Sequence, residues 1–350
     1  MIETENTDHP HELIIQILLR LPVKSLIRFK CVCKSWFSLI SDSHFANSQF
    51  QLTAATHTHR ALFISTQTRS VDLEASLDDD SSLVSLNLNV NDYSRINVEG
   101  SCRGFVFLQC STTFYIWNPS TGVYKQIPLC SNLDFDYFYG FGYDQLTDDY
   151  LVVSMSDDYS PQLLEFFSFR ANTWKQIKGT HIQSIHAIEG DQKVGLFFNG
   201  AIHWFAHCLD LQKDVIIAFD LMERKLLDMH LPDQFGFEGG LWVFREFLSL
   251  WGRNFDNDTV EIWAMKEYKV LSSWTKTHVL LIDAVPTKYF SPLCSTKSGD
   301  IVGTDDGTIL VKYNDEGQLL GHRYCNDPHG TQVVMYTESL LSLPGDNVQA

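Results

Sequence analysis

The chain has 350 residues, of which 44% are hydrophobic and 13% aromatic, so it can bury a large core and wholesale disorder is excluded. Its net charge of −17 at pH 7 argues against a nucleic-acid partner, because phosphate binding requires clustered Lys and Arg. The same charge mildly favours a basic protein partner, although acidic side chains also keep a chain soluble.

A stretch near the N-terminus, from Pro10 to Phe50, predicts three short helices and a fourth helical fragment. Pro10 suits the first position of a helix, where the missing N–H of proline is not needed. Pro22 can begin a helix but cannot continue one, so we expect a new helix to begin there. Asp42 or Ser43 can cap the last fragment through a side-chain oxygen.

The first of these helices is apolar on two faces. One stripe at helical spacing, which a small helical cluster would bury, consists of Leu13, Ile14, Ile17, Leu18 and Leu21. A second stripe, about a hundred degrees away, contains Ile15 and Leu19. A unit of about forty residues has too little interior to hide both stripes. The second stripe therefore binds a partner or packs on the rest of the chain, and the pattern favours the partner.

The run LIIQILLRLPVKSLIRFKCVCKSW resembles the F-box, in the form found in plant F-box proteins with a C-terminal F-box-associated or kelch-like domain. The resemblance implies docking on the Skp adaptor of an SCF-type ubiquitin ligase, and through the adaptor on a cullin scaffold. The remainder of the chain would then bind an unidentified protein substrate. The matching residues that would make or support the adaptor contact are Pro10, Leu13, Ile14, Ile17, Leu18, Leu21, Pro22, Leu26, Cys33 and Trp36.

One position departs from the family pattern, which opens with Leu-Pro where this chain has His9-Pro10. An apolar residue at the core of an interface contributes about 1 to 3 kcal/mol. We expect the histidine to weaken docking without abolishing it, because the rest of the apolar stripe is intact.

Charge is distributed unevenly along the chain. Residues 11–50 carry a net charge of +3, residues 1–10 carry −3, and residues 51–350 carry −17. The basic patch thus lies on the helices assigned to docking. It suits an acidic partner protein, and the adaptor family that the resemblance implies is acidic.

Beyond residue 60 the pattern is one of short apolar strands separated by turn residues, with no long helix. Ala61 to Ile64 is the first predicted strand. Asn199-Gly200 lies between two apolar runs and predicts a hairpin with a type I′ turn. Asp306-Gly307 predicts a second hairpin in the same way. The body of the protein is therefore expected to be all-β.

A repeated motif, an aromatic strand followed by a polar turn and a second strand, distinguishes between all-β folds. Its aromatic positions are Trp117, Phe169, Phe219, Trp263 and Tyr313, with steps of 52, 50, 44 and 50 residues. A kelch-type propeller has about 50 residues in each four-stranded blade. The sandwich alternative does not explain this recurring step. The repeat predicts a propeller-like domain of about six blades, and its few glycines resemble the F-box-associated variant.

The chain is thus expected to be a multidomain protein, with a small all-α F-box followed by an all-β propeller. The predicted parts are a polar tail at 1–9, the F-box at 10–50, a connector at 51–60 and the propeller at 61–345. The last strand, at Val333–Met335 or Leu340–Leu343, is expected to pair with Ala61–Ile64 and close the ring, which removes exposed sheet edges.

No local pattern predicts catalysis, a cofactor or a metal site. Cys31 and Cys33 are one residue too close for a zinc-binding pair, and structural packing is the better explanation for them. His203 and His207 would lie about 13 Å apart on a strand, which is too far to share one metal ion. Phosphate-binding loops and nucleophile elbows are not found. We therefore expect an adaptor subunit and not an enzyme.

Aromatic residues on propeller loops are good anchors for a protein partner. Candidates for substrate contact are Tyr137, Phe138, Phe237 and Trp242. Packing in the core is the alternative for these residues, and the sequence favours it.

The expected function is that of a substrate receptor in a ubiquitin ligase. One alternative is a propeller enzyme or sugar-binding module to which the helices are only appended. Another is an F-box scaffold that acts outside ubiquitination. The chain shows no signal segment and no run of eighteen apolar residues, so neither secretion nor a membrane span is expected. The eight scattered cysteines then predict reduced thiols in the cytoplasm or nucleus.

Overall fold

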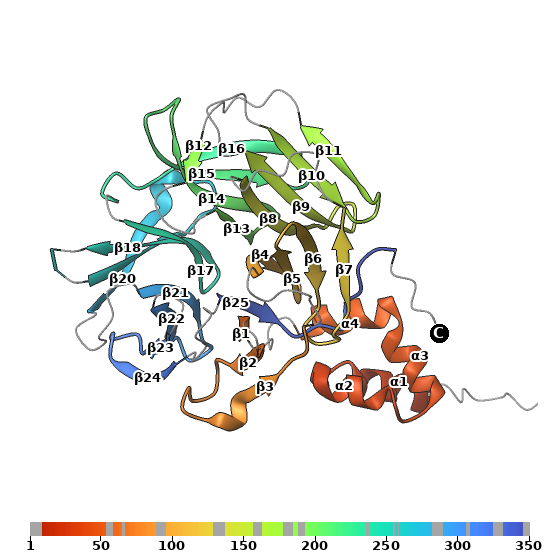
Figure 1. The fold of residues 1–350 in the computed structure, drawn as a ribbon. Coiled ribbons are helices and arrows are strands. Elements are labelled where there is room, and N and C mark those ends of the chain that lie inside the picture. Colours follow the sequence, from red (N-terminus) through yellow and green to blue (C-terminus); the bar gives the residue numbers. More distant parts are fainter. Residues whose placement is uncertain are drawn as a thin grey trace, which may run out of the picture.

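The computed structural model describes residues 9–53, 59–64, 67–88, 96–128, 137–156, 163–177, 185–187, 193–235, 238–254, 256–257, 259–281, 290–305, 309–324 and 332–345. Four helices come first and strands make up most of the rest (Figure 1). The helices are α1 (His9–Leu18), α2 (Val23–Phe29), α3 (Lys34–Ser41) and α4 (Ser43–Leu52). None of the described helices has the length and apolar character needed to cross a membrane.

The strands form six blades, two of which are joined in one larger sheet. The first blade contains β25 (Gln332–Thr337), β1 (His59–Ile64), β2 (Arg69–Asp72) and β3 (Leu83–Ser85). The second blade contains β4 (Ile96–Cys102), β5 (Phe105–Cys110), β6 (Thr113–Trp117) and β7 (Tyr124–Ile127). The third blade contains β8 (Tyr137–Asp144), β9 (Asp149–Ser156), β10 (Leu164–Ser168) and β11 (Thr173–Ile177). The fourth blade contains β13 (Val194–Phe198), β14 (Ala201–Cys208), β15 (Lys213–Asp220) and β16 (Lys225–His230), and the short β12 (Ile185–Ala187) pairs with β14. The fifth blade contains β17 (Glu238–Phe244), β18 (Phe247–Asn254), β19 (Thr259–Met265) and β20 (Trp274–Leu281). The sixth blade contains β21 (Phe290–Ser295), β22 (Ile301–Asp305), β23 (Ile309–Tyr313) and β24 (Leu319–Tyr324).

The blades surround a common centre (Figure 1). The inner strands contact one another in turn around it, in the order β25, β4, β8, β13, β17, β21 and back to β25. Each blade thus has one of these strands at the centre, and β3, β7, β11, β16, β20 and β24 lie at the outer edges. The prediction of a propeller with about six blades is confirmed for the described residues.

Two ends of the chain close the ring. β25 pairs antiparallel with β1, and Ala61, Leu62 and Phe63 face Met335, Val334 and Val333 in register. The predicted closure through Val333–Met335 is confirmed, whereas Leu340–Leu343 forms no strand. Because the first blade takes strands from both ends of the chain, the inner edge of that blade is paired and not exposed.

The aromatic repeat marks the third strand of successive blades. Trp117, Phe219, Trp263 and Tyr313 lie in β6, β15, β19 and β23, and Phe169 directly follows β10. All five side chains are buried. The step of about 50 residues therefore equals one blade, which is the physical basis of the blade count made from the sequence.

The hairpin between β13 and β14 turns at Asn199 and Gly200, whose φ angles are 47° and 76°. Both values are positive, as a type I′ turn requires, so this prediction is confirmed. The turn at Asp306-Gly307 lies outside the described residues, but β22 and β23 on either side of it pair antiparallel.

His203, on β14, is fully buried. Its Nδ1 lies 3.2 Å from the carbonyl oxygen of Leu196, and its Nε2 lies 2.8 Å from the hydroxyl of Tyr268. The neutral ring satisfies both contacts when Nδ1 donates to the carbonyl and Tyr268 donates to Nε2. Burial lowers the pKa of His203 to about 4, because a buried imidazolium loses its hydration.

This pKa predicts acid sensitivity of the propeller. Between pH 6.5 and about 4 the unfolded chain binds a proton at His203 that the folded chain does not, so stability is lost as the pH falls. We expect His203 to remove about 2 kcal/mol of the free energy of unfolding between pH 7 and pH 5. Urea unfolding of wild type and His203→Gln at both pH values measures this. The variant should lose about 2 kcal/mol less than wild type over that interval, and equal losses would contradict the prediction.

The cysteines that the structure describes are all free thiols. Cys102, Cys110, Cys208 and Cys294 are buried, whereas Cys31 and Cys33 are exposed. Burial raises the pKa of the Cys294 thiol to about 12, which keeps that thiol protonated and unreactive.

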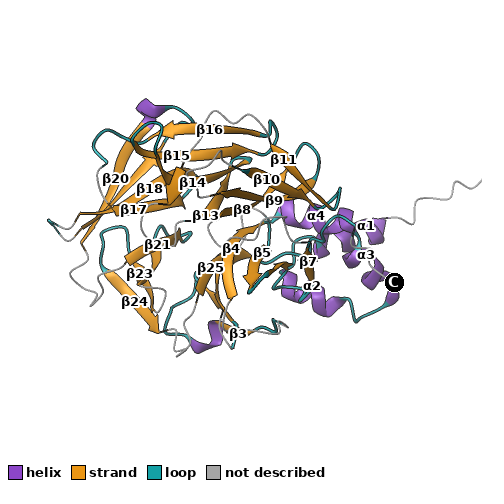
Figure 2. Cartoon of the chain, turned by 45° about the horizontal axis from the view of Figure 1, so that its top comes forward, coloured by secondary structure: helices purple, strands orange, loops and turns teal. Residues whose placement is uncertain are grey.

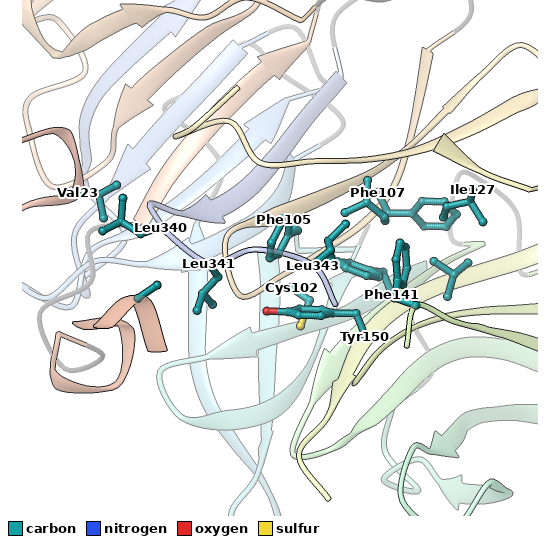
Figure 3. Close-up of a cluster of buried hydrophobic side chains, with 14 of the residues drawn as sticks. Val23, Cys102, Phe105, Phe107, Ile127, Phe141, Tyr150, Leu340, Leu341 and Leu343 are labelled. Carbon is teal, nitrogen blue, oxygen red and sulfur yellow. The ribbon is translucent and has the colours of Figure 1, made fainter. Parts of the chain in front are cut away.

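The helices lie at one side of the propeller, beside the second and third blades (Figure 2). One continuous apolar cluster runs from the helices into these blades. Within it, Val23 of α2 lies beside Leu340 of the C-terminal segment, and Phe105 and Phe107 follow in the second blade (Figure 3). The helices therefore share a core with the propeller.

Candidate adaptor-binding face

The four helices begin and end where local chemistry dictates. Pro22 has a non-helical ψ of 145° and stands directly before α2, so the predicted break before this proline is confirmed. Cys33 is extended, with φ of −160°, and separates α2 from α3. Asp42 caps α4 by accepting a hydrogen bond of 3.0 Å from the backbone N–H of Phe45, which decides between Asp42 and Ser43.

The inward face of the helical domain is apolar and well buried. Leu18 and Leu26 are 1% and 0% exposed, and Ile40 and Phe45 are buried with them. Ile14, Leu21 and Trp36 are partly buried and pack on the same cluster. Trp36 also contacts the ring of Phe29, with centroids 5.4 Å apart. These predicted residues thus support the shape of the domain from inside.

The expectation that the Ile15 and Leu19 stripe is the unpartnered one is wrong. Leu19 is only 8% exposed, and Ile15 packs against the cluster that the helices share with the propeller. The exposed residues of α1 instead come from the other stripe. Helical periodicity separates the two stripes, but packing within the folded protein decides which one is covered.

Leu13 and Ile17 are the exposed apolar residues of α1, with 63% and 61% of each side chain in solvent. They are four residues apart and therefore lie on one face of the helix. Val32 and Phe37 are also exposed, at 60% and 43%. Large apolar side chains exposed in so small a domain are typical of a protein-binding surface. We call the exposed side of α1 that carries Leu13 and Ile17 the apolar face.

Val32 and Phe37 were not predicted from the sequence. The signal for Phe37 was available, because Trp36, Phe37, Leu39 and Ile40 cover more than one side of α3. The two-face argument used for α1 thus also applies to α3. Of the other predicted residues, Pro22 and Cys33 are exposed, and the side chain of Pro10 lies outside the description.

The helical domain that carries the apolar face also exposes several basic side chains. Lys24, Arg28 and Lys34 are exposed and form no ion pair with any described residue. Arg20 donates only to the backbone carbonyl and side-chain oxygen of Gln16. Lys30 is half-buried, and burial lowers its pKa. Apolar side chains with unpaired cations around them complement an acidic protein surface that has an apolar centre.

The structure excludes two of the four residues considered for substrate contact. Phe138 is 0% exposed and Trp242 is 3% exposed, because both lie on inner strands and pack in the cores of their blades. These two predictions are wrong, and the core alternative holds for them. The side chain of Tyr137 and the whole of Phe237 lie outside the description.

The described residues include no group of three His, Cys, Asp or Glu side chains placed to hold a metal ion. Two carboxylates of the turn between β8 and β9 form ion pairs within the propeller, Asp148 with Arg170 at 3.0 Å and Asp144 with Arg224 at 2.7 Å. What the helical domain offers is therefore a surface for binding.

Two family models match the chain. Residues 7–47 match the F-box domain, and residues 54–320 match the F-box associated beta propeller domain. An F-box/kelch-repeat protein of Arabidopsis thaliana is 31% identical, over 96% of this chain and 96% of its own length. The F-box protein CPR1 of Arabidopsis thaliana is 29% identical, over 96% of this chain and 90% of its own length.

Solved structures that resemble this chain share only its fold. TolB from Acinetobacter baumannii is 10% identical with a TM-score of 0.51, and the similarity covers 84% of this chain and 72% of TolB. A chain of a nidogen/laminin complex is 12% identical with a TM-score of 0.50, covering 80% of this chain and 99% of the other. The four helices agree with the F-box match, and the six blades agree with the propeller match. The chain belongs to the plant-type F-box proteins that carry an F-box associated beta propeller domain.

Proposed function

We propose that this protein is the substrate-recognition subunit of an SCF-type ubiquitin ligase. The main observation behind the proposal is the apolar face of α1, where Leu13 and Ile17 are exposed. The same helical domain exposes Lys24, Arg28 and Lys34, which pair with no described carboxylate. This face would bind a Skp-type adaptor, which in turn connects to a cullin scaffold. The propeller would bind a protein substrate, which is then ubiquitinated and degraded.

Such a subunit needs no catalytic residue of its own. It raises the effective concentration of the substrate next to the ubiquitin-carrying enzyme and orients the two, and both effects accelerate a transfer reaction. A rigid blade architecture supports this role, because the buried inner strands hold the loops of the propeller at fixed positions.

The test is reconstitution of the full chain with a plant Skp adaptor, a cullin and its RING partner. Size-exclusion chromatography should give a complex with one adaptor per chain. Addition of ubiquitin, E1 and E2 should then modify lysines of the chain itself. Adaptor binding without any ubiquitin transfer would favour the scaffold alternative, and absence of adaptor binding would refute the proposal.

His9 offers a graded version of this test. His9→Leu restores the apolar residue with which the family pattern opens, and we expect it to tighten adaptor binding about tenfold. Surface plasmon resonance with immobilised adaptor measures the change. Equal affinities would mean that position 9 lies outside the contact.

A further inference from the structure

Arg103 is a residue of the propeller that contacts the helical domain directly. It occupies the tip of the turn between β4 and β5 with φ of 49°, followed by Gly104 with φ of 88°. A two-residue turn with two positive φ angles is tight, so the side chain of Arg103 begins from a fixed position. That side chain extends from the second blade to α4.

The guanidinium group of Arg103 contacts both domains at once. On the helical side it donates to Oδ1 of Asn47 at 3.1 Å and lies 5.0 Å from the ring centre of Phe50. On the propeller side it lies 4.0 Å from the ring centre of Tyr143 and donates to the hydroxyl of Tyr150 at 3.3 Å. A planar cation can stack and donate in several directions together, which a lysine ammonium cannot.

A second contact runs beside the first. The C-terminal segment 339–343 lies on the second blade, where Asn118 Nδ2 donates to the carbonyls of Ser339 and Leu341 at 3.1 and 3.2 Å. The backbone N–H of Ser339 donates to Ser120 Oγ at 3.0 Å. From this segment Leu340 packs in the shared cluster beside Val23 of α2 (Figure 3). The apolar contact holds the domains together, but it has no preferred direction.

Domains of one chain move relative to each other unless their interface is large and apolar. Here the apolar cluster provides adhesion, and Arg103 supplies directional contacts between described residues of the two domains. We propose that Arg103 is a positioning residue that sets the orientation of the adaptor-binding helices on the propeller. The positioning role rests on the proposed function in one respect. In a ubiquitin ligase, the orientation of the helices sets the distance from bound substrate to the ubiquitin-carrying enzyme.

The chain contains a matched control for Arg103. Arg245 occupies the same position in the fifth blade, in the two-residue turn between β17 and β18, with φ of 56°. Its guanidinium also stacks on an aromatic ring, 5.1 Å from the centre of Phe244. No contact of Arg245 with the helices is present in the described structure. Arg245→Ala therefore also removes a cation–π contact made by an arginine in a tight turn. It leaves the contacts between the helical domain and the propeller in place.

The experiment is hydrogen–deuterium exchange, followed by mass spectrometry, on the full chain as wild type, Arg103→Ala, Arg103→Lys and Arg245→Ala. In Arg103→Ala we expect the amides of α4 to exchange about tenfold faster, since the hydrogen bond to Asn47 and the cation–π contact with Phe50 are lost. Exchange in the sixth blade should stay unchanged. Arg103→Lys should resemble the alanine variant, and Arg245→Ala should resemble wild type at α4.

A functional readout then separates positioning from folding. The adaptor affinity of Arg103→Ala should stay within about twofold of wild type, because the described partners of Arg103 in the helical domain lie on α4 and not on α1. Self-ubiquitination at equal adaptor occupancy should spread over more lysines and slow several-fold, as orientation is lost. If wild type fails to bind the adaptor, the proposed function fails, while the exchange experiment still tests the positioning role. Unchanged exchange at α4 in Arg103→Ala, or full rescue by lysine, would overturn the inference.

Discussion

Replacement of both Leu13 and Ile17 by aspartate is expected to abolish adaptor binding while the protein stays folded. Each side chain is more than 60% exposed in the free chain, so the substitutions remove little from the core. At an interface centre each residue of this kind contributes about 2 kcal/mol, and a buried unpaired carboxylate adds a further cost. We expect the dissociation constant for the adaptor to rise by at least about a hundredfold.

Titration of the adaptor by isothermal calorimetry measures this effect, and circular dichroism checks the fold. A matched control is Leu146→Asp combined with Leu320→Asp. These leucines are 71% and 51% exposed, but they lie on the propeller. The control should bind the adaptor as wild type does. Retained binding by the Leu13 and Ile17 variant would show that the adaptor uses another surface.

Leu18 and Trp36 are poor choices for this test. Leu18 is 1% exposed and Trp36 packs in the shared cluster, so their truncation creates a cavity or places a charge in the core. Such changes cost about 2 to 5 kcal/mol of stability. A loss of binding by those variants would report unfolding of the helical domain and would not locate the adaptor.

Gly104→Ala is expected to destabilise the propeller strongly. A Cβ atom at position 104 would lie 2.2 Å from the Cβ of Ser339 and 2.8 Å from the carbonyl oxygen of Thr337. The φ angle of 88° is itself unfavourable for alanine. The second blade and the C-terminal segment must therefore separate. We expect a loss of at least about 3 kcal/mol in the free energy of unfolding.

Gly122→Ala is the control for this prediction. Gly122 has a similar φ of 75° and lies in the same blade, but a Cβ there meets no atom within 4 Å. It should cost only the backbone strain, about 1 kcal/mol. Urea unfolding followed by tryptophan fluorescence measures both variants. Equal losses would mean that the contact between position 104 and the C-terminal segment contributes nothing.

The blade count was predictable because it depends on a repeat. Trp117, Phe169, Phe219 and Trp263 follow one another at steps of 52, 50 and 44 residues, since each lies in or directly after the third strand of a blade. Ring closure was predictable for a related reason, because a propeller without β25 would leave an inner edge unpaired. Local chemistry likewise decided the helix boundaries at Pro22 and Asp42.

Contacts between distant segments were not predictable. Ile15 and Leu19 lie in the cluster that the helices share with the propeller, whereas Leu13 and Ile17 are exposed. Phe138 and Trp242 resemble loop aromatics in the sequence, but their strands run through the buried interior of the blades. Arg103 carries no local signal at all. Its partners Asn47, Tyr143 and Tyr150 meet only in the folded protein.

The sequence by itself determined the class of each domain, the helix breaks at Pro22 and Asp42, the approximate number of blades and two candidate strands for closing the ring. These follow from local propensity and from periodicity, which involve neighbouring residues or one repeated unit. Only the tertiary structure decided which face of α1 is exposed and how the helices are held on the second blade. Those features depend on packing between segments about fifty to three hundred residues apart, and no local pattern records which surfaces will meet.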